Sequence, residues 1–170
     1  LGKLIDLEEI KLKTNIKNPF KVIIDSNSGC SSFAHCYIEG IKNTESPKWL
    51  KDKLISIGMS PISAVVDITN YIMLDLNRPL HAYDADKVDR KITVRSSKKG
   101  EKFLALDNNK YSLEEDACLI TNDQEILGLG GVIGGESSSI SLDTKNIFLE
   151  SALFDPVKIS KIAKKLGINS

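Results

Sequence analysis

The stretch KITVRSSKKGEKFLALDNNKYS, residues 91–112, points to the fold class. Its apolar runs Ile92-Thr93-Val94 and Phe103-Leu104-Ala105-Leu106 are short, and the polar cluster Asp107-Asn108-Asn109 follows the second run. Further short apolar runs occur at 118–120, 126–127, 140–142 and 147–149. Short strands separated by turn residues are typical of an antiparallel meander or sandwich. Residues 91–150 therefore predict a body of β-strands.

Helical patterns lie on both sides of this β-rich body. Residues 46–58 begin with serine and a first-turn proline and carry apolar residues at helical spacing. Residues 60–77 predict a second helix, and we expect it to be buried because apolar residues cover most of its circumference. A last helix is predicted over 155–167, with aspartate at its start and glycine at its end. The chain is therefore predicted to be α+β, with a sandwich-like body of antiparallel or mixed sheets and flanking helices.

Length and composition predict one compact domain. The 170 residues, 41% of them hydrophobic, suffice for one core and leave little room for a second. We divide the chain into a lead-in, residues 1–29, with an edge strand at Val22-Ile23-Ile24, and a domain over 30–170. No apolar run approaches the roughly 20 residues that span a bilayer, so no membrane partner is expected. Because the chain opens on leucine without a methionine, we expect a fragment of a longer protein.

Charge and cysteine content limit the classes of function. Lysine plus arginine and aspartate plus glutamate both number 23, so no global field attracts nucleic acid and any RNA contact must be local. The three cysteines, Cys30, Cys36 and Cys118, are odd in number and lie in apolar stretches. That pattern favours buried, reduced thiols over a disulfide framework and predicts a cytoplasmic location.

Three polar residues, Asp67, Thr69 and Asn70, lie inside the second predicted helix. A buried polar group without a partner costs about 1–3 kcal/mol, so we expect these side chains to be paired or to have a chemical role. One interpretation is a hydrogen-bond network that ties the helix to neighbouring loops, and Asp67 fits it best. The other is participation in a site, and the residues alone leave both interpretations open.

His81 is the natural acid/base or ester-binding candidate. It is one of two histidines and lies in a proline-restricted loop directly after the second helix, although an ordinary core or surface histidine is the simpler alternative. His35 adjoins Cys36, but no second Cys/His pair stands at ligand spacing, so no metal site is expected.

The glycine run 128–135 lacks the Gly-x-Gly-x-x-Gly spacing, and no helix follows it, which argues against a nucleotide-binding loop. Its unobstructed backbone N–H groups could instead bind a small polar group of a ligand. Glu150 follows the apolar run 147–149 and is either a surface carboxylate or a hydrogen-bond acceptor that projects into a cleft.

Five segments, taken in chain order, carry a family resemblance: Trp49-Leu50, Val66-Asp67-Ile68-Thr69-Asn70-Tyr71, Arg78-Pro79-Leu80-His81-Ala82-Tyr83-Asp84, Gly130-Gly131-Val132-Ile133-Gly134-Gly135 and Phe148-Leu149-Glu150-Ser151-Ala152. They resemble the editing module formed by the third and fourth domains of the bacterial phenylalanyl-tRNA synthetase β subunit. The resemblance covers roughly residues 30–168, nearly the whole predicted domain.

The resemblance implies a β-rich module that hydrolyses the ester of tyrosyl-tRNA(Phe). It places Thr69, Asn70 and His81 around the ester and the attacking water, and Gly131 and Glu150 around the tyrosine hydroxyl. The implied partners are the 3′ end of tRNA(Phe) and the α subunit of a heterotetrameric parent enzyme. No cofactor is implied in this fragment, since ATP and magnesium serve the parent enzyme elsewhere. The alternative is a non-enzymatic RNA-docking or scaffold module of the synthetase.

Overall fold

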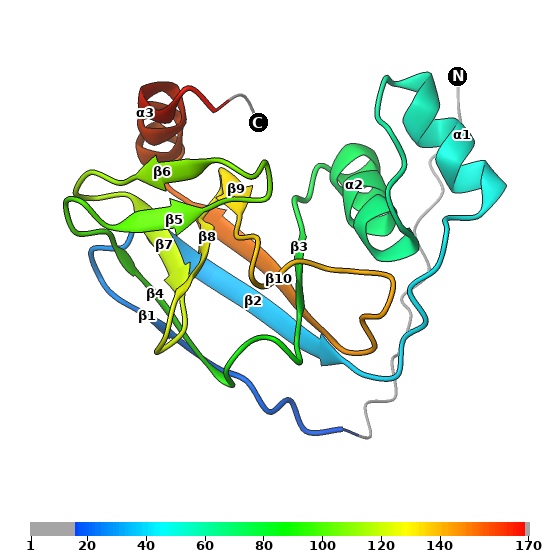
Figure 1. Ribbon diagram of the computed structural model, residues 1–170, viewed down its shortest axis with the longest axis horizontal. Coiled ribbons are helices and arrows are strands. Elements are labelled where there is room, and N and C mark those ends of the chain that lie inside the picture. The colour runs from blue at the N-terminus through cyan, green and yellow to red at the C-terminus, as the bar shows by residue number, and fades with distance from the viewer. Residues whose placement is uncertain (1–15, 169–170) are drawn as a thin grey trace, which may run out of the picture.

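The computed structural model describes residues 16–168, and residues 1–15 of the predicted lead-in and 169–170 lie outside that description. The helices are α1 (Lys48–Ser56), α2 (Ala64–Leu76) and α3 (Pro156–Leu166). The strands are β1 (Lys21–Ile24), β2 (Cys30–Ile38), β3 (His81–Asp84), β4 (Lys91–Ser96), β5 (Lys102–Leu104), β6 (Lys110–Ser112), β7 (Cys118–Thr121), β8 (Ile126–Leu129), β9 (Ile133–Gly134) and β10 (Ile147–Phe154). Figure 1 shows a body of strands with helices around it, which confirms the α+β prediction.

The strands form two larger sheets and a hairpin. One sheet has the order β1-β4-β7-β8-β9, the second has the order β2-β10-β3, and β5 pairs with β6. β1 pairs with β4 in parallel, and the other pairings are antiparallel. β1 lies at the edge of its sheet, which confirms the edge strand predicted in the lead-in.

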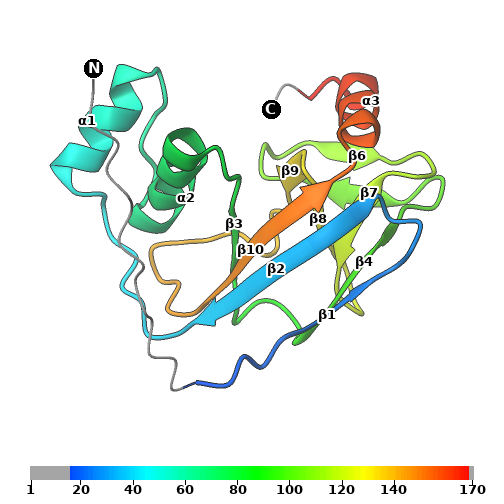
Figure 2. The same cartoon turned by 180° about the vertical axis from the view of Figure 1, so that it is seen from behind.

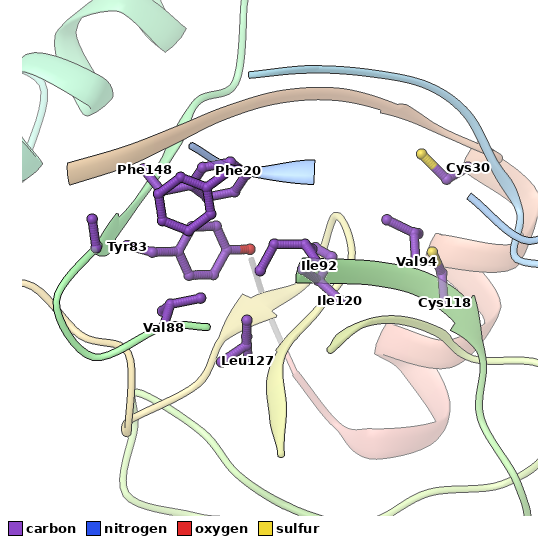
Figure 3. Close-up of a cluster of buried hydrophobic side chains, with 11 residues drawn as sticks. Phe20, Cys30, Tyr83, Val88, Ile92, Val94, Cys118, Ile120, Leu127 and Phe148 are labelled. Carbon is purple, nitrogen blue, oxygen red and sulfur yellow. The ribbon is translucent and has the colours of Figure 1, made fainter. Parts of the chain in front are cut away.

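The two larger sheets pack together around an apolar core (Figure 3). Tyr83 of β3 and Phe148 of β10 meet Ile92 and Ile120 of the five-stranded sheet. Phe20, directly before β1, packs its ring 4.5 Å from that of Phe148, so the segment before the first strand contributes to the core. Aromatic rings at this separation add packing energy beyond the area that they bury.

A second apolar cluster lies on the other face of the five-stranded sheet. All four residues of β7 are buried, and three of them pack into the clusters: Cys118 and Ile120 into the first and Leu119 into the second. Ile162 and Leu166 of α3 pack against this second cluster. α3 therefore covers the outer face of the sheet near the β5–β6 hairpin, as Figure 1 shows.

The predicted burial of the second helix is wrong. α2 begins at Ala64 rather than at residue 60 or 61, and only Asp67 and Thr69 are buried in it. Ile68 and Leu76 are 47% and 54% exposed. The main neighbours of α2 are α1 and β3, which leave much of its circumference open (Figure 2). An all-round apolar pattern therefore does not by itself place a helix in this core.

Other local predictions are also wrong. Residues 140–142 form no strand, because the backbone of Ser141 and the side chain of Thr144 bond to each other and close a turn. Pro47 occupies the N-cap of α1 rather than its first helical position. Cys36, expected to be buried, is exposed on β2, although all three cysteines are free as predicted.

Candidate functional site

His81 and Glu150 face each other across two neighbouring strands. Asn77 adopts the left-handed conformation that ends α2, Pro79 follows, and β3 then begins at His81, so the loop predicted for this histidine is a strand. β3 pairs with β10 in a register that puts His81 directly opposite Glu150. Directly opposed residues of antiparallel strands present their side chains on the same face, with Cβ atoms about 5 Å apart. The backbone pairing thus brings together two residues that are 69 positions apart in the chain.

A cleft of about 1150 Å³ opens over these two side chains. The lining comes from the end of α2 with the link to β3, from strands of the body including β3, β8 and β10, from the glycine segment between β8 and β9, and from α3. The lining includes His81, Tyr83, Glu150, Gly131 and Gly134. Three of the residues predicted for the site, His81, Glu150 and Gly131, therefore share one cavity.

Glu150 is held by a tyrosine that the sequence reasoning did not assign to the site. The Tyr83 hydroxyl donates to Glu150 Oε2 at 2.6 Å, and these residues are 1% and 5% exposed. Burial raises the pKa of the Glu150 carboxyl to about 7, and the Tyr83 hydrogen bond opposes that rise. Burial and the neighbouring carboxyl raise the pKa of Tyr83 well above its usual value.

The second oxygen of Glu150 remains available to a ligand. Oε1 accepts no hydrogen bond from the described residues. No fully buried side-chain nitrogen or oxygen among those residues lacks a partner, so Oε1 must be reachable from the cleft. One carboxyl oxygen is thus committed to Tyr83, and the other can accept a hydrogen bond from a bound molecule.

His81 is a neutral imidazole with free ring nitrogens. Desolvation by burial lowers its pKa to about 4, so the ring is uncharged at neutral pH. It packs edge-on against the Tyr83 ring at a centroid distance of 4.5 Å, and neither nitrogen bonds to a described residue. The ring is therefore positioned by packing while its nitrogens can bond to a ligand or to water.

Glycine at position 134 makes room for this imidazole. A Cβ atom on Gly134 would lie 2.5 Å from His81 Cε1 and 2.7 Å from Nε2. Gly131 has a φ of +70°, which side chains rarely adopt, and its N–H makes no hydrogen bond within the described part of the chain. The glycine run offers an unpaired backbone donor of the kind that its composition predicted, and it also makes room for the histidine ring, which the sequence did not predict.

Thr69 and Asn70 do not line the cleft. Both lie on α2, where the Thr69 hydroxyl donates to the carbonyl of Val66 at 2.7 Å. Met73, one helical turn further along, does line it. The structure thus places these two residues beside the cleft rather than in it, and their assigned roles stay predictions.

Asp67 is structural, as the first of the two sequence interpretations proposed. Its fully buried carboxylate accepts a hydrogen bond from Ser46 Oγ at 2.5 Å and from the Ile62 backbone N–H at 2.8 Å. These bonds join α2 to the segments before α1 and before α2 itself. Burial of this polar group is tolerated because both of its oxygens are hydrogen-bonded.

His35 is the other histidine opposite Glu150, and it does not share the cleft. It pairs with Glu150 from β2, on the other side of β10, and its Nδ1 lies 3.0 Å from the Asn18 amide. The cleft lining includes His81 and not His35. Within residues 16–168, no group of three or more His, Cys, Asp or Glu side chains is arranged to hold a metal ion.

The arrangement combines a neutral imidazole, a carboxyl oxygen and a backbone N–H within one cleft. In a comparison with known protein families, residues 29–170 of this chain match the family described as the B3/4 domain. The chain belongs to the B3/4 domain family. This match, together with relatives that are phenylalanine–tRNA ligase β subunits, confirms the resemblance to that subunit drawn from the five sequence segments.

Curated relatives of this B3/4 domain are phenylalanine–tRNA ligase β subunits. The protein from Mesorhizobium japonicum is 43% identical over 168 residues, which cover 99% of this chain and 21% of that protein. The protein from the Wolbachia of Brugia malayi is 45% identical over 148 residues, which cover 87% of this chain and 18% of that protein. The chain thus spans about a fifth of the length of these relatives.

A solved structure shares the fold of this B3/4 domain. An N-terminal fragment of the phenylalanyl-tRNA synthetase β subunit from Pyrococcus horikoshii aligns with a TM-score of 0.62 over 92% of this chain and 51% of that one. Its sequence identity is 16%, so the likeness concerns the fold alone. Among the described helices, none is long and apolar enough to cross a membrane.

Proposed function

We propose that this domain hydrolyses the aminoacyl ester of tyrosyl-tRNA(Phe). It would act as the proofreading module of a cytoplasmic phenylalanyl-tRNA synthetase β subunit, whose α subunit completes the parent enzyme. That parent would attach phenylalanine to tRNA(Phe) with ATP and magnesium at a separate site, and no cofactor is required in the cleft. The observation that carries the proposal is the cleft in which His81 and Glu150 lie opposite each other. The names of the curated relatives support the parent activity.

Glu150 and Gly131 provide the selectivity for tyrosine in this proposal. Glu150 Oε1 accepts the phenolic hydrogen, and the Gly131 N–H donates to the phenolic oxygen. A synthetic pocket built for phenylalanine rejects an added hydroxyl by only about a hundredfold, whereas a site that bonds to the hydroxyl rejects phenylalanine by roughly 10⁴-fold or more. A phenylalanyl ester would leave the Glu150 oxygen and the Gly131 N–H unpaired.

His81 orients the ester and its attacking water rather than acting as a strong general base. A general base works best with a pKa near the operating pH, and the pKa of His81 is about 4. Its neutral ring can donate from one nitrogen and accept at the other, which suits a group that holds the ester. The resemblance assigns Thr69 and Asn70 to that water, but neither lines the cleft, so His81 carries the positioning in this proposal. An aminoacyl ester is already activated, so positioning supplies much of the acceleration that it needs.

Deacylation measured with four variants tests the proposal. His81→Ala should slow hydrolysis of tyrosyl-tRNA(Phe), up to the 10²–10⁴-fold range of a positioned acid/base group. Glu150→Ala should slow it as well and should narrow the preference for tyrosyl-tRNA over phenylalanyl-tRNA. His35→Ala is the matched histidine control, because this residue also faces Glu150 but does not line the cleft. Glu136→Ala, an exposed carboxylate outside the cleft, is the matched control for Glu150.

Unchanged tyrosyl-tRNA hydrolysis in both His81→Ala and Glu150→Ala refutes the proposed site. That result favours the non-enzymatic scaffold or RNA-docking module as the function of the domain. Amino-acid-dependent pyrophosphate exchange in the parent enzyme serves as the folding control, because neither substitution touches a synthetic site. Its loss would report misfolding of the variant.

A further inference from the structure

The formal charges at the cleft are unevenly distributed. Of the described residues that line it, two carry a positive charge, Arg78 and Lys164, and Glu150 is the one acidic residue. Glu150 lies on the floor of the cleft and is 5% exposed, whereas Arg78 and Lys164 are both exposed. The chain as a whole has no net charge, so this positive rim is a local feature.

The charged groups of Arg78 and Lys164 have no partner within the described part of the chain. Neither makes an ion pair or a side-chain hydrogen bond with another residue of the described segment, 16–168. The other arginines are both engaged, since Arg90 donates to the Ala85 carbonyl and Arg95 forms a two-pronged pair with Glu101. Arg78 is therefore the arginine that remains available for an external partner.

The lysines of α3 also differ in their surroundings. Lys158 donates to the Asn27 carbonyl at 3.1 Å, and Lys165 lies 3.7 Å from Glu114. Lys161 is exposed but does not line the cleft, so among these lysines the cleft lining contains Lys164 alone. A solvated helix face accounts for the presence of four lysines on α3. It does not account for the position of Lys164 at the cleft.

The two cations approach the cleft from different elements. Arg78 lies in the link between α2 and β3, and Lys164 lies in the last turn of α3. α2 and α3 stand apart in both views, with strands of the body between them (Figures 1 and 2). The cleft volume of about 1150 Å³ exceeds the 300–1,000 Å³ of a typical small-molecule pocket, so it has room beyond a single amino acid.

We propose that Arg78 and Lys164 bind phosphate groups in the single-stranded 3′ end of the tRNA. The inference rests on the proposed function, because an aminoacyl ester held at His81 continues into a ribose and then into the phosphodiester backbone. A guanidinium forms paired hydrogen bonds with phosphate, and a lysine ammonium serves as a point charge. Glu150 recognises the amino acid at the floor, and the two cations hold the nucleic acid at the rim.

Binding of a short single-stranded RNA that ends in CCA tests this inference. Fluorescence anisotropy with this chain would be measured between 50 and 200 mM salt. Two phosphate contacts to a single strand predict a slope of log K against log salt near −1.4, or about a sevenfold loss of affinity over that range. Arg78→Gln or Lys164→Gln should each reduce the slope to about −0.7, which corresponds to a loss of about 2.5-fold. Lys161→Gln, three residues away on the same helix, should keep the wild-type slope.

The double variant Arg78→Gln/Lys164→Gln gives the decisive result. A wild-type salt slope in this variant overturns the inference, and so does a lack of measurable RNA binding by the wild-type chain. If Lys161→Gln reduces the salt slope as much as Lys164→Gln does, the inference is also overturned. The attraction would then come from the basic helix as a whole and not from the residue at the cleft. Failure of the proposed function is read separately: a chain that binds the RNA with the predicted slope but releases no tyrosine refutes the hydrolysis alone.

Discussion

Removing Glu150 or His81 should change the pH dependence of stability in opposite directions. Burial raises the pKa of Glu150 from 4.5 to about 7 and lowers the pKa of His81 from 6.5 to about 4. A group whose pKa is raised in the folded state makes its full contribution to the unfolding free energy below its unfolded-state pKa. The contribution of Glu150 is therefore lost as pH rises from 4.5 to 7. The lowered pKa of His81 has the reverse effect, and its contribution is lost as pH falls from 6.5 to 4.

The two effects are similar in size. Each pKa lies about 2.5 from its ordinary value, which corresponds to up to about 3 kcal/mol of unfolding free energy. In the wild type the two contributions largely cancel between pH 4.5 and 6.5, because one falls while the other rises. A single substitution removes that cancellation and leaves the partner's contribution visible.

Urea unfolding of the wild type, Glu150→Gln and His81→Gln between pH 4 and 8 measures the effect. Subtracting the wild-type profile removes the titration of groups that all three proteins share. Relative to wild type, Glu150→Gln should gain up to about 3 kcal/mol as pH rises from 4.5 to 7. His81→Gln should lose up to about 3 kcal/mol as pH rises from 4 to 6.5. Two flat difference profiles would refute the claim that burial shifts these groups, and Glu136→Gln is the control for loss of a surface carboxylate.

Further outcomes follow from the contacts around the cleft. Tyr83→Phe keeps the ring but loses the bond to Glu150, so urea unfolding at pH 8 should show a cost of about 1.5–3 kcal/mol. Gly134→Ala places a Cβ 2.5 Å from His81 Cε1 and displaces the ring, and tyrosyl-tRNA deacylation should fall by on the order of a hundredfold. Thiol titration of the folded chain should label Cys36 first, and the two buried cysteines should react on unfolding to give three free thiols.

Matched controls accompany these measurements. Gly128→Ala is the control for Gly134→Ala, because its Cβ would make ordinary contacts at 3.6 Å and deacylation should persist. Wild-type stability of Tyr83→Phe at pH 8 would show that its hydroxyl contributes nothing to the buried pair. Fewer than three reactive thiols in the unfolded, unreduced chain would reveal a disulfide and contradict the reduced state.

The sequence predicts those features that depend on neighbouring residues. The last helix begins as expected, with Asp155 accepting from the Val157 and Lys158 N–H groups, and it ends at Gly167 in the left-handed conformation. Asn77 ends α2 in the same conformation, as its place before Pro79 indicated. These caps are set by a few adjacent side chains, so the sequence suffices to recognise them. The starts of α1 and α2 are exceptions, and Ser46, the expected cap of α1, bonds to Asp67 instead.

The sequence does not predict features that depend on strand register. The bond from Tyr83 to Glu150 exists because β3 lies beside β10 in the one register that aligns residues 81 and 150. Shifting that register by one residue would turn Glu150 to the other face of the sheet. The exposure of α2 likewise follows from which elements surround it and not from its own apolar pattern.

The placement of Glu150 favours a binding site over a scaffold. A buried carboxyl lowers stability relative to an apolar side chain of similar size unless hydrogen bonds compensate for its desolvation. Tyr83 compensates at Oε2 only, and Oε1 opens toward a cleft that also contains His81 and the unpaired N–H of Gly131. A scaffold gains nothing from a half-satisfied carboxyl at the floor of a cavity. A site that must distinguish a phenol from a phenyl ring needs an acceptor of this kind, because only the phenol can complete its hydrogen bonds.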